Sequence, residues 1–328
     1  MSRKLGLGII GAGEVFQFHV PHKTTTPQEV IDHPDVEVVF ILTFDDSHAP
    51  LACAILKAGK HVFIEKPVTL SLPSLESMID AEKNAPNGAR VFVGYMRRYA
   101  PSFVEAFKRE IATIPKILYA RVRDFSGPNT NFVNQSGTFQ VQNSDQRDAR
   151  LEDLFAEAFP NEPITDEKRK YCRFLGSLGS HDISLMREVL GFPEDVVAVS
   201  VNDPFYTAMT FRNTDGSTFS TTYESGIDEV PMSDAHMAVY GATKRVIVKY
   251  DSPYAKGLPI YVEVDEVNER GEAQHRSVLS SYEDAYTAEL QELYETVVNA
   301  KPIKSTVSDA KQDLQIYDMM YRRFSQQV

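Results

Sequence analysis

One lysine of this chain stands where it could take part in proton and charge transfer beside a bound small molecule. Lys66 follows the predicted strand His61–Ile64, from which Glu65 separates it, and is itself followed by Pro67. An ammonium at the end of a strand can donate a hydrogen bond to a substrate hydroxyl and stabilise charge that develops on its oxygen. The alternative is an ordinary surface lysine that ends a strand.

A second candidate for proton transfer is His181. It lies in Gly179-Ser180-His181-Asp182-Ile183, which leads into a predicted helix. Histidine is the commonest general acid and base near neutral pH, and the alternative is a capping or packing role. The other seven of the eight histidines form no cluster with metal-ligand spacing, so no metal site is predicted.

Two further segments could hold a ligand. Gly11-Ala12-Gly13 follows an apolar run, and glycines there permit a tight turn and close approach of the backbone to a pyrophosphate. Phe16 replaces the final small residue of that fingerprint, and a purely structural turn is the alternative. Gly94-Tyr95-Met96-Arg97-Arg98-Tyr99 could line a polar cleft or form a solvated crossover.

The elements that position these residues alternate between strands and helices over the first hundred residues. Such alternation predicts a parallel sheet with helical crossovers, and ligands bind outside the carboxyl ends of its strands. Lys66 and Gly11 both stand at such ends. The predicted strands are 5–10, 36–43, 61–64 and 90–94, and the predicted helices are 27–34, 49–58 and 71–84.

After residue 115 the pattern becomes one of alternating strands interrupted by helices. It predicts an α+β domain built on an open, mostly antiparallel sheet, so the chain is α/β with a Rossmann-like domain over 1–98 and a second domain over 99–328. Residues 126–147 are polar and predict a loop. The strands expected are 117–125, 196–201, 207–212, 218–223, 236–240, 245–250 and 260–267, with helices at 148–158, 166–175, 181–190, 282–300 and 307–326.

The composition excludes several classes of protein. The chain has 328 residues, a net charge of −12 and 42% hydrophobic residues, which argues against disorder and against nucleic-acid binding. Neither a membrane span nor a secretory signal is evident, so a cytoplasmic protein is expected. Cys53 and Cys172 have neither the number nor the spacing of a disulfide framework or a zinc site.

Taken together, the motifs resemble one family, the glucose–fructose oxidoreductase / inositol dehydrogenase / MocA-type NAD(P)-dependent oxidoreductases. The resemblance covers nearly the whole chain in order. The residues that carry it are Gly-Ile-Ile-Gly-Ala-Gly (8–13), Thr43 with His48 five residues on, Ala58-Gly59-Lys60-His61-Val62 followed by Glu65-Lys66-Pro67, Gly-Tyr-Met-Arg-Arg-Tyr (94–99) and Gly179-Ser180-His181-Asp182-Ile183.

The resemblance implies hydride transfer between nicotinamide and a hydroxyl-bearing carbon of a sugar, inositol or related polyol. It implies Lys66 and His181 as catalytic residues, and a homodimer or homotetramer through the C-terminal sheet. The cofactor, NAD or NADP, would be bound by Gly11, Gly13, Glu14, Val15, Thr43, Phe44, His48, Glu65, Lys66 and Arg97. The substrate would be bound by Lys66, Tyr95, Arg98, His181 and Asp182.

Three departures from the family pattern stand out. Ser177 and Ser184 occupy positions, four before and three after His181, where the family often has aspartate. Phe16 replaces a small residue. Only 32 positions separate Gly11 from Thr43, although a single βαβ unit takes about 30 residues. We therefore expect the Rossmann domain to lack a βα unit, which would leave residues 6–10 as an exposed apolar edge.

The missing segment would carry the residue that distinguishes NAD from NADP. Glu29 and Asp32 lie at about the right distance along the chain but on a predicted helix, so neither is assigned to the ribose. Two alternatives to an enzyme stay open at this point. The chain could be a non-catalytic, ligand-sensing member of the same family, or an inactive shortened isoform that associates with full-length subunits.

Overall fold

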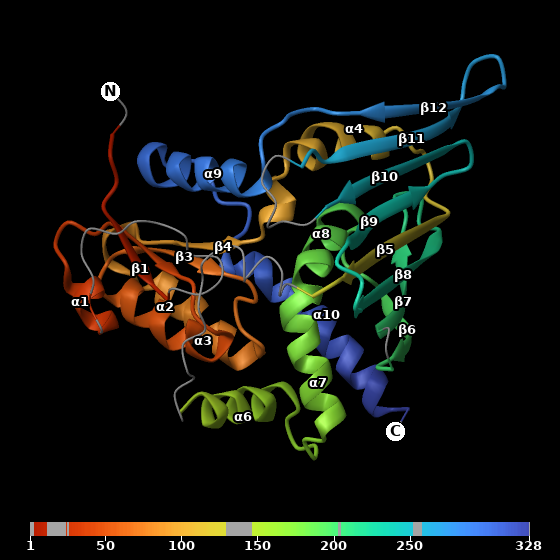
Figure 1. Cartoon of the computed structure of the whole chain (residues 1–328). Coiled ribbons are helices and arrows are strands. Elements are labelled where there is room, and N and C mark those ends of the chain that lie inside the picture. The colour runs from red at the N-terminus through yellow and green to blue at the C-terminus, as the bar shows by residue number, and fades with distance from the viewer. Residues whose placement is uncertain are drawn as a thin grey trace. The chain divides into compact units, whose positions relative to one another are not determined.

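The structure is a computed structural model that describes residues 3–11, 24, 26–128, 146–202, 205–251 and 258–327. Figure 1 shows the elements that these residues form. Contacts divide the chain into two compact units, of which the first comprises residues 1–95, 130–177 and 291–315. The second comprises residues 96–129, 178–290 and 316–328.

The domain boundary expected after residue 98 lies close to residue 95, where the first segment of the first unit ends. Later segments of the chain, however, also belong to the first unit. Helix α6 (Gln146–Ala158) is one of them, since Glu157 accepts a hydrogen bond of 2.8 Å from the Ser74 hydroxyl. The carbonyl of Ser305 likewise accepts from the amide of Val93 at 2.9 Å. These bonds join residues far apart in the sequence, so a boundary drawn from local composition misses them.

The first unit is built on a four-stranded parallel sheet in the order β1-β2-β3-β4, drawn in red to orange in Figure 1. This confirms the predicted Rossmann-like arrangement of strands and crossover helices. Its elements are β1 (Leu7–Ile10), α1 (Pro27–Asp32), β2 (Val38–Ile41), a 3-10 turn (Asp45–Ser47), α2 (His48–Lys57), β3 (His61–Glu65), α3 (Leu72–Lys83), a 3-10 turn (Pro86–Gly88), β4 (Val91–Gly94), α6 and α7 (Asp166–Phe174).

The centre of this sheet is buried because its strands are apolar along almost their whole length. In β2, Val38, Val39 and Ile41 are fully buried. The ring of Phe63 in β3 stacks against Phe40 at 4.7 Å on one side and Phe92 at 5.8 Å on the other, both measured between ring centroids. These stacked rings tie three neighbouring strands together across one face.

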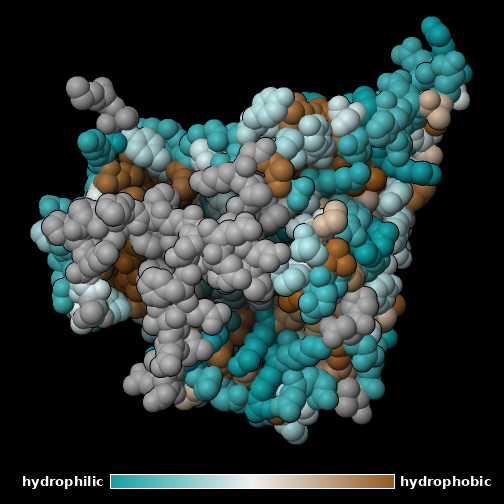
Figure 2. Space-filling view, in the orientation of Figure 1, coloured by the Kyte–Doolittle hydropathy of each residue, from teal (hydrophilic) through white to brown (hydrophobic). Residues whose placement is uncertain are grey.

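Strand β1 lies at the edge of the sheet among the described residues, as the sequence predicts. The carbonyls of Gly6 and Ile10 accept hydrogen bonds from β2 and its flanking residues, so the peptide groups of Leu7 and Ile9 point away from β2. The Leu7 side chain is 52% exposed, whereas Ile10 is buried. Figure 2 shows hydrophobic surface in the region where Figure 1 places β1.

The second unit contains an eight-stranded sheet in the order β12-β11-β10-β9-β5-β8-β7-β6. Every neighbouring pair is antiparallel except β5 and β8, which confirms the predicted, mostly antiparallel sheet. Its elements are a 3-10 turn (Met96–Tyr99), a π-helical turn (Ser102–Phe107), α4 (Lys108–Ile111), β5 (Tyr119–Ser126), α8 (Ser180–Leu190), β6 (Asp195–Ser200), β7 (Phe205–Arg212), β8 (Thr218–Ile227), β9 (Ser233–Tyr240), β10 (Lys244–Tyr250), β11 (Tyr261–Val267) and β12 (Ala273–Val278).

Several helical segments lie where the chain passes from one unit to the other. A π-helical turn (Leu175–Gly179) precedes α8, and helices α9 (Ala285–Asn299) and α10 (Val307–Ser325) each have residues in both units. The predicted loop 126–147 falls mostly outside the described residues. Among those that are described, no helix combines the length and apolar character needed to cross a bilayer.

A substitution in β1 tests the exposed edge. Leu7→Lys should reduce concentration-dependent association, because a lysine on an edge strand obstructs pairing with another strand. Leu7 is already 52% exposed, so the melting temperature should change by no more than about 2 °C. Light scattering over a concentration series measures the association.

The matched control is Leu118→Lys, because Leu118 is also 52% exposed and lies just before the central strand β5. If the two variants associate alike, or if neither differs from the unmodified chain, the edge of β1 is not a pairing surface.

Candidate active site

The candidate residues of the first unit gather at the carboxyl edge of its parallel sheet. The register aligns Ile10 of β1 with Ile41 of β2, and Ile41 with Ile64 of β3. Gly11, Thr43 and Lys66, which follow these strands, therefore emerge along one edge. This is the edge where open α/β sheets bind their ligands.

Gly11 fixes the way in which β1 ends. Its φ is +98°, a conformation that favours glycine. A Cβ placed there would lie 2.6 Å from the carbonyl carbon and oxygen of Leu42, so any larger residue would push β1 away from β2. The next predicted cofactor ligands, Gly13, Glu14 and Val15, lie outside the described residues.

His48 lies between two loops of this edge. Its Nδ1 is 2.7 Å from the carbonyl oxygen of Pro67, and its Nε2 is 3.1 Å from that of Thr43. The side chain is buried, and burial lowers the pKa of the imidazole. We assign a neutral ring that donates from Nδ1, the nitrogen with the shorter contact, to Pro67, so that Nε2 contacts the Thr43 carbonyl without donating to it. The structure thus gives His48 a positioning role for the segment that carries Lys66 and Pro67.

Lys66 is half-buried and its amine is held at a defined place. Nζ donates a hydrogen bond of 3.0 Å to the backbone carbonyl of Ser177, within the same unit. Its backbone amide donates to the Glu65 carboxylate at 3.2 Å, and burial raises the pKa of Glu65. Ser177 is the position where the family often has aspartate, so here a neutral carbonyl oxygen receives the hydrogen bond from the ammonium.

Helix α6 adds a residue that the sequence analysis missed. The guanidinium carbon of Arg147 lies 3.8 Å from the centroid of the Phe44 ring, which is more than half exposed at this edge. Asp45 beside it is largely buried, and this burial raises the pKa of its carboxyl group, an effect that His48 and Arg147 oppose. Arg150 of the same helix pairs with Asp46 at 2.7 Å. About a hundred positions separate these partners, and no local pattern links them.

In the second unit, Arg97 joins two carboxylates in the core. One nitrogen, Nη1, lies 2.8 Å from Asp124 and 2.6 Å from Asp182, and all three side chains are buried. The guanidinium also lies over the Tyr250 ring at 5.2 Å. Burial and the neighbouring Asp124 raise the pKa of Asp182 well above its usual range. Burial and Asp124 therefore disfavour the charged form of Asp182, whereas Arg97 favours it.

The other predicted residues of the second unit differ in exposure. Arg98 is buried and donates to Glu188 at 2.5 Å, whereas His181 is half-buried as the second residue of α8. In the first unit, Tyr95 is buried as the last residue before the units divide. Burial and ion pairing hold Arg97, Arg98 and Asp182 in place, and the roles in cofactor or substrate binding expected for them stay predictions.

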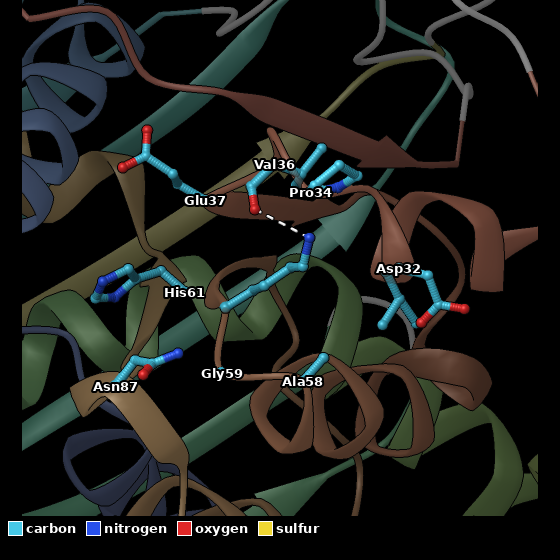
Figure 3. Close-up of a pocket in the computed structure, with 10 residues that line it drawn as sticks. Asp32, Pro34, Val36, Glu37, Ala58, Gly59, His61 and Asn87 are labelled. Atoms are coloured by element: carbon cyan, nitrogen blue, oxygen red, sulfur yellow. Dashed lines mark hydrogen bonds between the residues drawn. The ribbon is translucent and has the colours of Figure 1, made fainter.

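A pocket of about 540 Å³ lies at the opposite, amino-terminal edge of the parallel sheet. Figure 3 shows its lining, in which the Lys60 amine donates to the carbonyl of Val36 at 3.0 Å. Asp32, His61 and Asn87 border the same space. Since doubly wound sheets bind dinucleotides at the other edge, this pocket is separate from the candidate site. Over the described ranges, no group of three His, Cys, Asp or Glu residues could hold a metal ion.

The burial of His48 predicts a loss of stability in mild acid. The unfolded ring takes up a proton near pH 6.5 while the buried ring resists it, so the unfolded state binds more protons as the pH falls. The free energy of unfolding should therefore decrease from about pH 6.5 downward, by up to about 1.4 kcal/mol per pH unit from this one group. His48→Gln should remove the part of this decrease that comes from His48. Urea-induced unfolding at a series of pH values from about 6.5 downward measures the difference.

The other histidines are unchanged in this variant, so their contributions cancel in the difference between the two proteins. Parallel pH dependences for the two proteins would contradict the assignment of a neutral His48.

The buried cluster predicts a large difference between two substitutions. Arg97→Met should cost about 3–5 kcal/mol, because it leaves two carboxyl groups buried without a cation. Asp182→Asn should cost about 1 kcal/mol or less, because burial already disfavours the charged form of this carboxyl and an amide of similar shape can still accept from Arg97. Urea-induced unfolding measures both. Equal losses in the two variants would contradict this expectation.

Comparison with known proteins agrees with this architecture. Residues 12–95 match the profile "Oxidoreductase family, NAD-binding Rossmann fold", and residues 163–328 match "Oxidoreductase family, C-terminal alpha/beta domain". The scyllo-inositol 2-dehydrogenase (NAD(+)) of Bacillus subtilis is 35% identical over 114 residues, which are 34% of this chain and 33% of that enzyme. The match thus spans a third of that relative.

Two further proteins resemble the chain over most of its length. The oxidoreductase YrbE of Bacillus subtilis is 24% identical over 355 aligned positions, which cover 95% of this chain and 92% of YrbE. Because 355 exceeds the 328 residues present here, at least 27 positions of that alignment have no residue in this chain. A levoglucosan dehydrogenase solved with NADH and levoglucosan has a TM-score of 0.66 at 18% identity, covering 93% of this chain and 82% of the other.

The two domain profiles together account for most of the sequence, and the observed sheets are those that they describe. This chain belongs to the Gfo/Idh/MocA oxidoreductase family.

Proposed function

We propose that the chain is a nicotinamide-dependent oxidoreductase that transfers a hydride between the cofactor and a hydroxyl-bearing carbon of a sugar, inositol or related polyol. The observation that carries the proposal is Lys66, whose amine is held at the carboxyl edge of the sheet by the carbonyl of Ser177. Family membership supports it, as do relatives named for inositol and levoglucosan oxidation.

The residues at the carboxyl edge fit the nicotinamide side of a bound cofactor, which would accept or supply the hydride. Gly11 lets the backbone turn tightly at the end of β1. Thr43 and the exposed ring of Phe44 follow β2, and Glu65 with Lys66 follows β3. These side chains would orient the nicotinamide and its ribose, while His48 donates to Pro67 and holds the loop that follows β3.

In this proposal Lys66 binds the reacting hydroxyl and stabilises the charge that develops on its oxygen when the proton leaves. Its hydrogen bond to the neutral Ser177 carbonyl orients the amine without cancelling its charge. His181 would exchange the proton with solvent. Since Ser177 supplies no carboxylate, a water molecule or the substrate itself would complete the relay.

One observation favours a second candidate function, a non-catalytic protein that binds a ligand and signals its presence. Ser177 and Ser184 occupy positions where the family often has aspartate, and the described part of the first sheet has fewer strands than a complete dinucleotide-binding domain. Cofactor binding without turnover over a broad panel of polyols would support this function, and the absence of binding would support an inactive isoform.

Association and location complete the proposal. We propose a homodimer or homotetramer formed through the C-terminal sheet, because the resemblance to the family implies such an assembly. We also propose a cytoplasmic location.

The decisive variant is Lys66→Ala. It should lower turnover by about 10²–10³-fold, because it removes the group that stabilises charge on the substrate oxygen. The measurement is the rate of nicotinamide reduction with a panel of inositols, sugars and other polyols, together with a thermal melt to confirm folding. Lys57→Ala is the matched control, because Lys57 is exposed at the end of helix α2, just before the start of β3, whereas Lys66 follows the other end of that strand. Near-normal turnover of Lys66→Ala would remove the proposed role.

A further inference from the structure

We propose that the cofactor site of this chain recognises the nicotinamide mononucleotide half of the cofactor and has no site for the adenosine half. The site would therefore treat NADH, NADPH and the reduced mononucleotide NMNH alike. This inference rests on the proposed function, because it concerns the same carboxyl edge of the parallel sheet.

The first argument is the order of the strands. A complete doubly wound fold has the order 3-2-1-4-5-6, in which two mononucleotide-binding halves meet at strand 1. Here the order is β1-β2-β3-β4, so β1 has one neighbour among the described strands and every described crossover steps in the same direction. The reversal of strand order that creates a dinucleotide crevice is absent from the described sheet.

The second argument is the length of chain available for the other half. The missing strands would have to lie between Gly11 and β2, and helix α1 already begins at Pro27. Only 15 residues separate Gly11 from Pro27, whereas one βαβ unit takes about 30 residues. This count comes from the sequence alone and applies whatever conformation the intervening residues adopt.

The third argument concerns the acidic residue that would bind the adenosine ribose. In the fingerprint this residue ends the second strand, about 20 positions after the glycines. The acids nearest that distance are Glu29 and Asp32, and both are on helix α1. Glu29 accepts from the Thr26 hydroxyl at 2.8 Å, and Asp32 accepts from Gln28 at 2.8 Å.

Asp32 also lies at the wrong edge of the sheet. It lines the pocket shown in Figure 3 together with Glu37 and His61, which stand at the amino-terminal starts of β2 and β3. The carboxyl edge with Gly11 and Lys66 is at the other ends of these strands. Neither the ribose hydroxyl nor a 2′-phosphate would therefore meet a recognising group from this helix.

The described residues do supply groups that would bind the nicotinamide half of the cofactor. Gly11, Thr43 and Lys66 stand at the ends of three adjacent parallel strands, and His48 fixes the loop after β3 by donating to Pro67. The chemistry recognised there would be a nicotinamide ring, its ribose and one 5′-phosphate. Adding adenosine to such a ligand would add no contact that the described residues supply.

Direct binding measurements test this inference without relying on turnover. Titration of the full chain with NADH, NADPH and NMNH, followed by nicotinamide fluorescence or by calorimetry, should give dissociation constants within about threefold of one another. Oxidised NMN should displace bound NADH, whereas AMP at equal concentration should not. Glu29→Gln and Asp32→Asn are the matched controls, and each should leave all three dissociation constants unchanged.

A preference for NADH or NADPH over NMNH of about tenfold or more would overturn the inference, and so would displacement by AMP. Either result would leave the proposed function intact, because the dinucleotide would still be bound. Equal binding without turnover would uphold the inference and contradict the enzymatic function. If none of the three ligands binds, both proposals fail.

Discussion

The close approach of β1 to the end of β2 is the constraint on which the candidate site depends. Gly11 has a positive φ and no room for a Cβ against Leu42, and the amide of Leu42 donates to the carbonyl of Ile10 at 2.8 Å. These contacts make β1 and β2 direct parallel neighbours. The loops after β1, β2 and β3 consequently leave the sheet side by side, and the groups suited to nicotinamide chemistry stand on them.

The cations of the two units have different surroundings. Arg97 and Arg98 are buried and paired with carboxylates. Their charges are compensated within the core, where a lone charge would be very costly. Lys66 is half-buried, and its amine donates to the carbonyl oxygen of Ser177. Burial thus constrains the two arginines more than it constrains the lysine.

Local sequence patterns are enough to predict the parallel strands of the first unit and the edge of the sheet where the candidate residues gather. Apolar runs and their terminating glycines are sufficient to predict all four parallel strands, and the rule that ligands bind at carboxyl ends places Gly11 and Lys66 together. Strand β12 could not be predicted, because Ala273–Val278 is mostly exposed and lacks apolar alternation. Arg147 was missed because its partner Phe44 is about a hundred positions away. The shared guanidinium of Arg97 depends in the same way on Asp124, which no spacing connects to Asp182.

The placement of β5 determines when the chain can fold during its synthesis. This strand pairs with β8 on one side and β9 on the other. About a hundred further residues must therefore be synthesised before β5 can pair with either of them. In the first unit, the amide of Val93 donates to the carbonyl of Ser305, which lies near the end of the chain. Pairings over such distances form slowly and leave apolar strands exposed to other nascent chains. A ribosome carrying this chain would therefore hold an incomplete first unit and an unfinished second sheet at once, and chaperones would have a long interval in which to bind them.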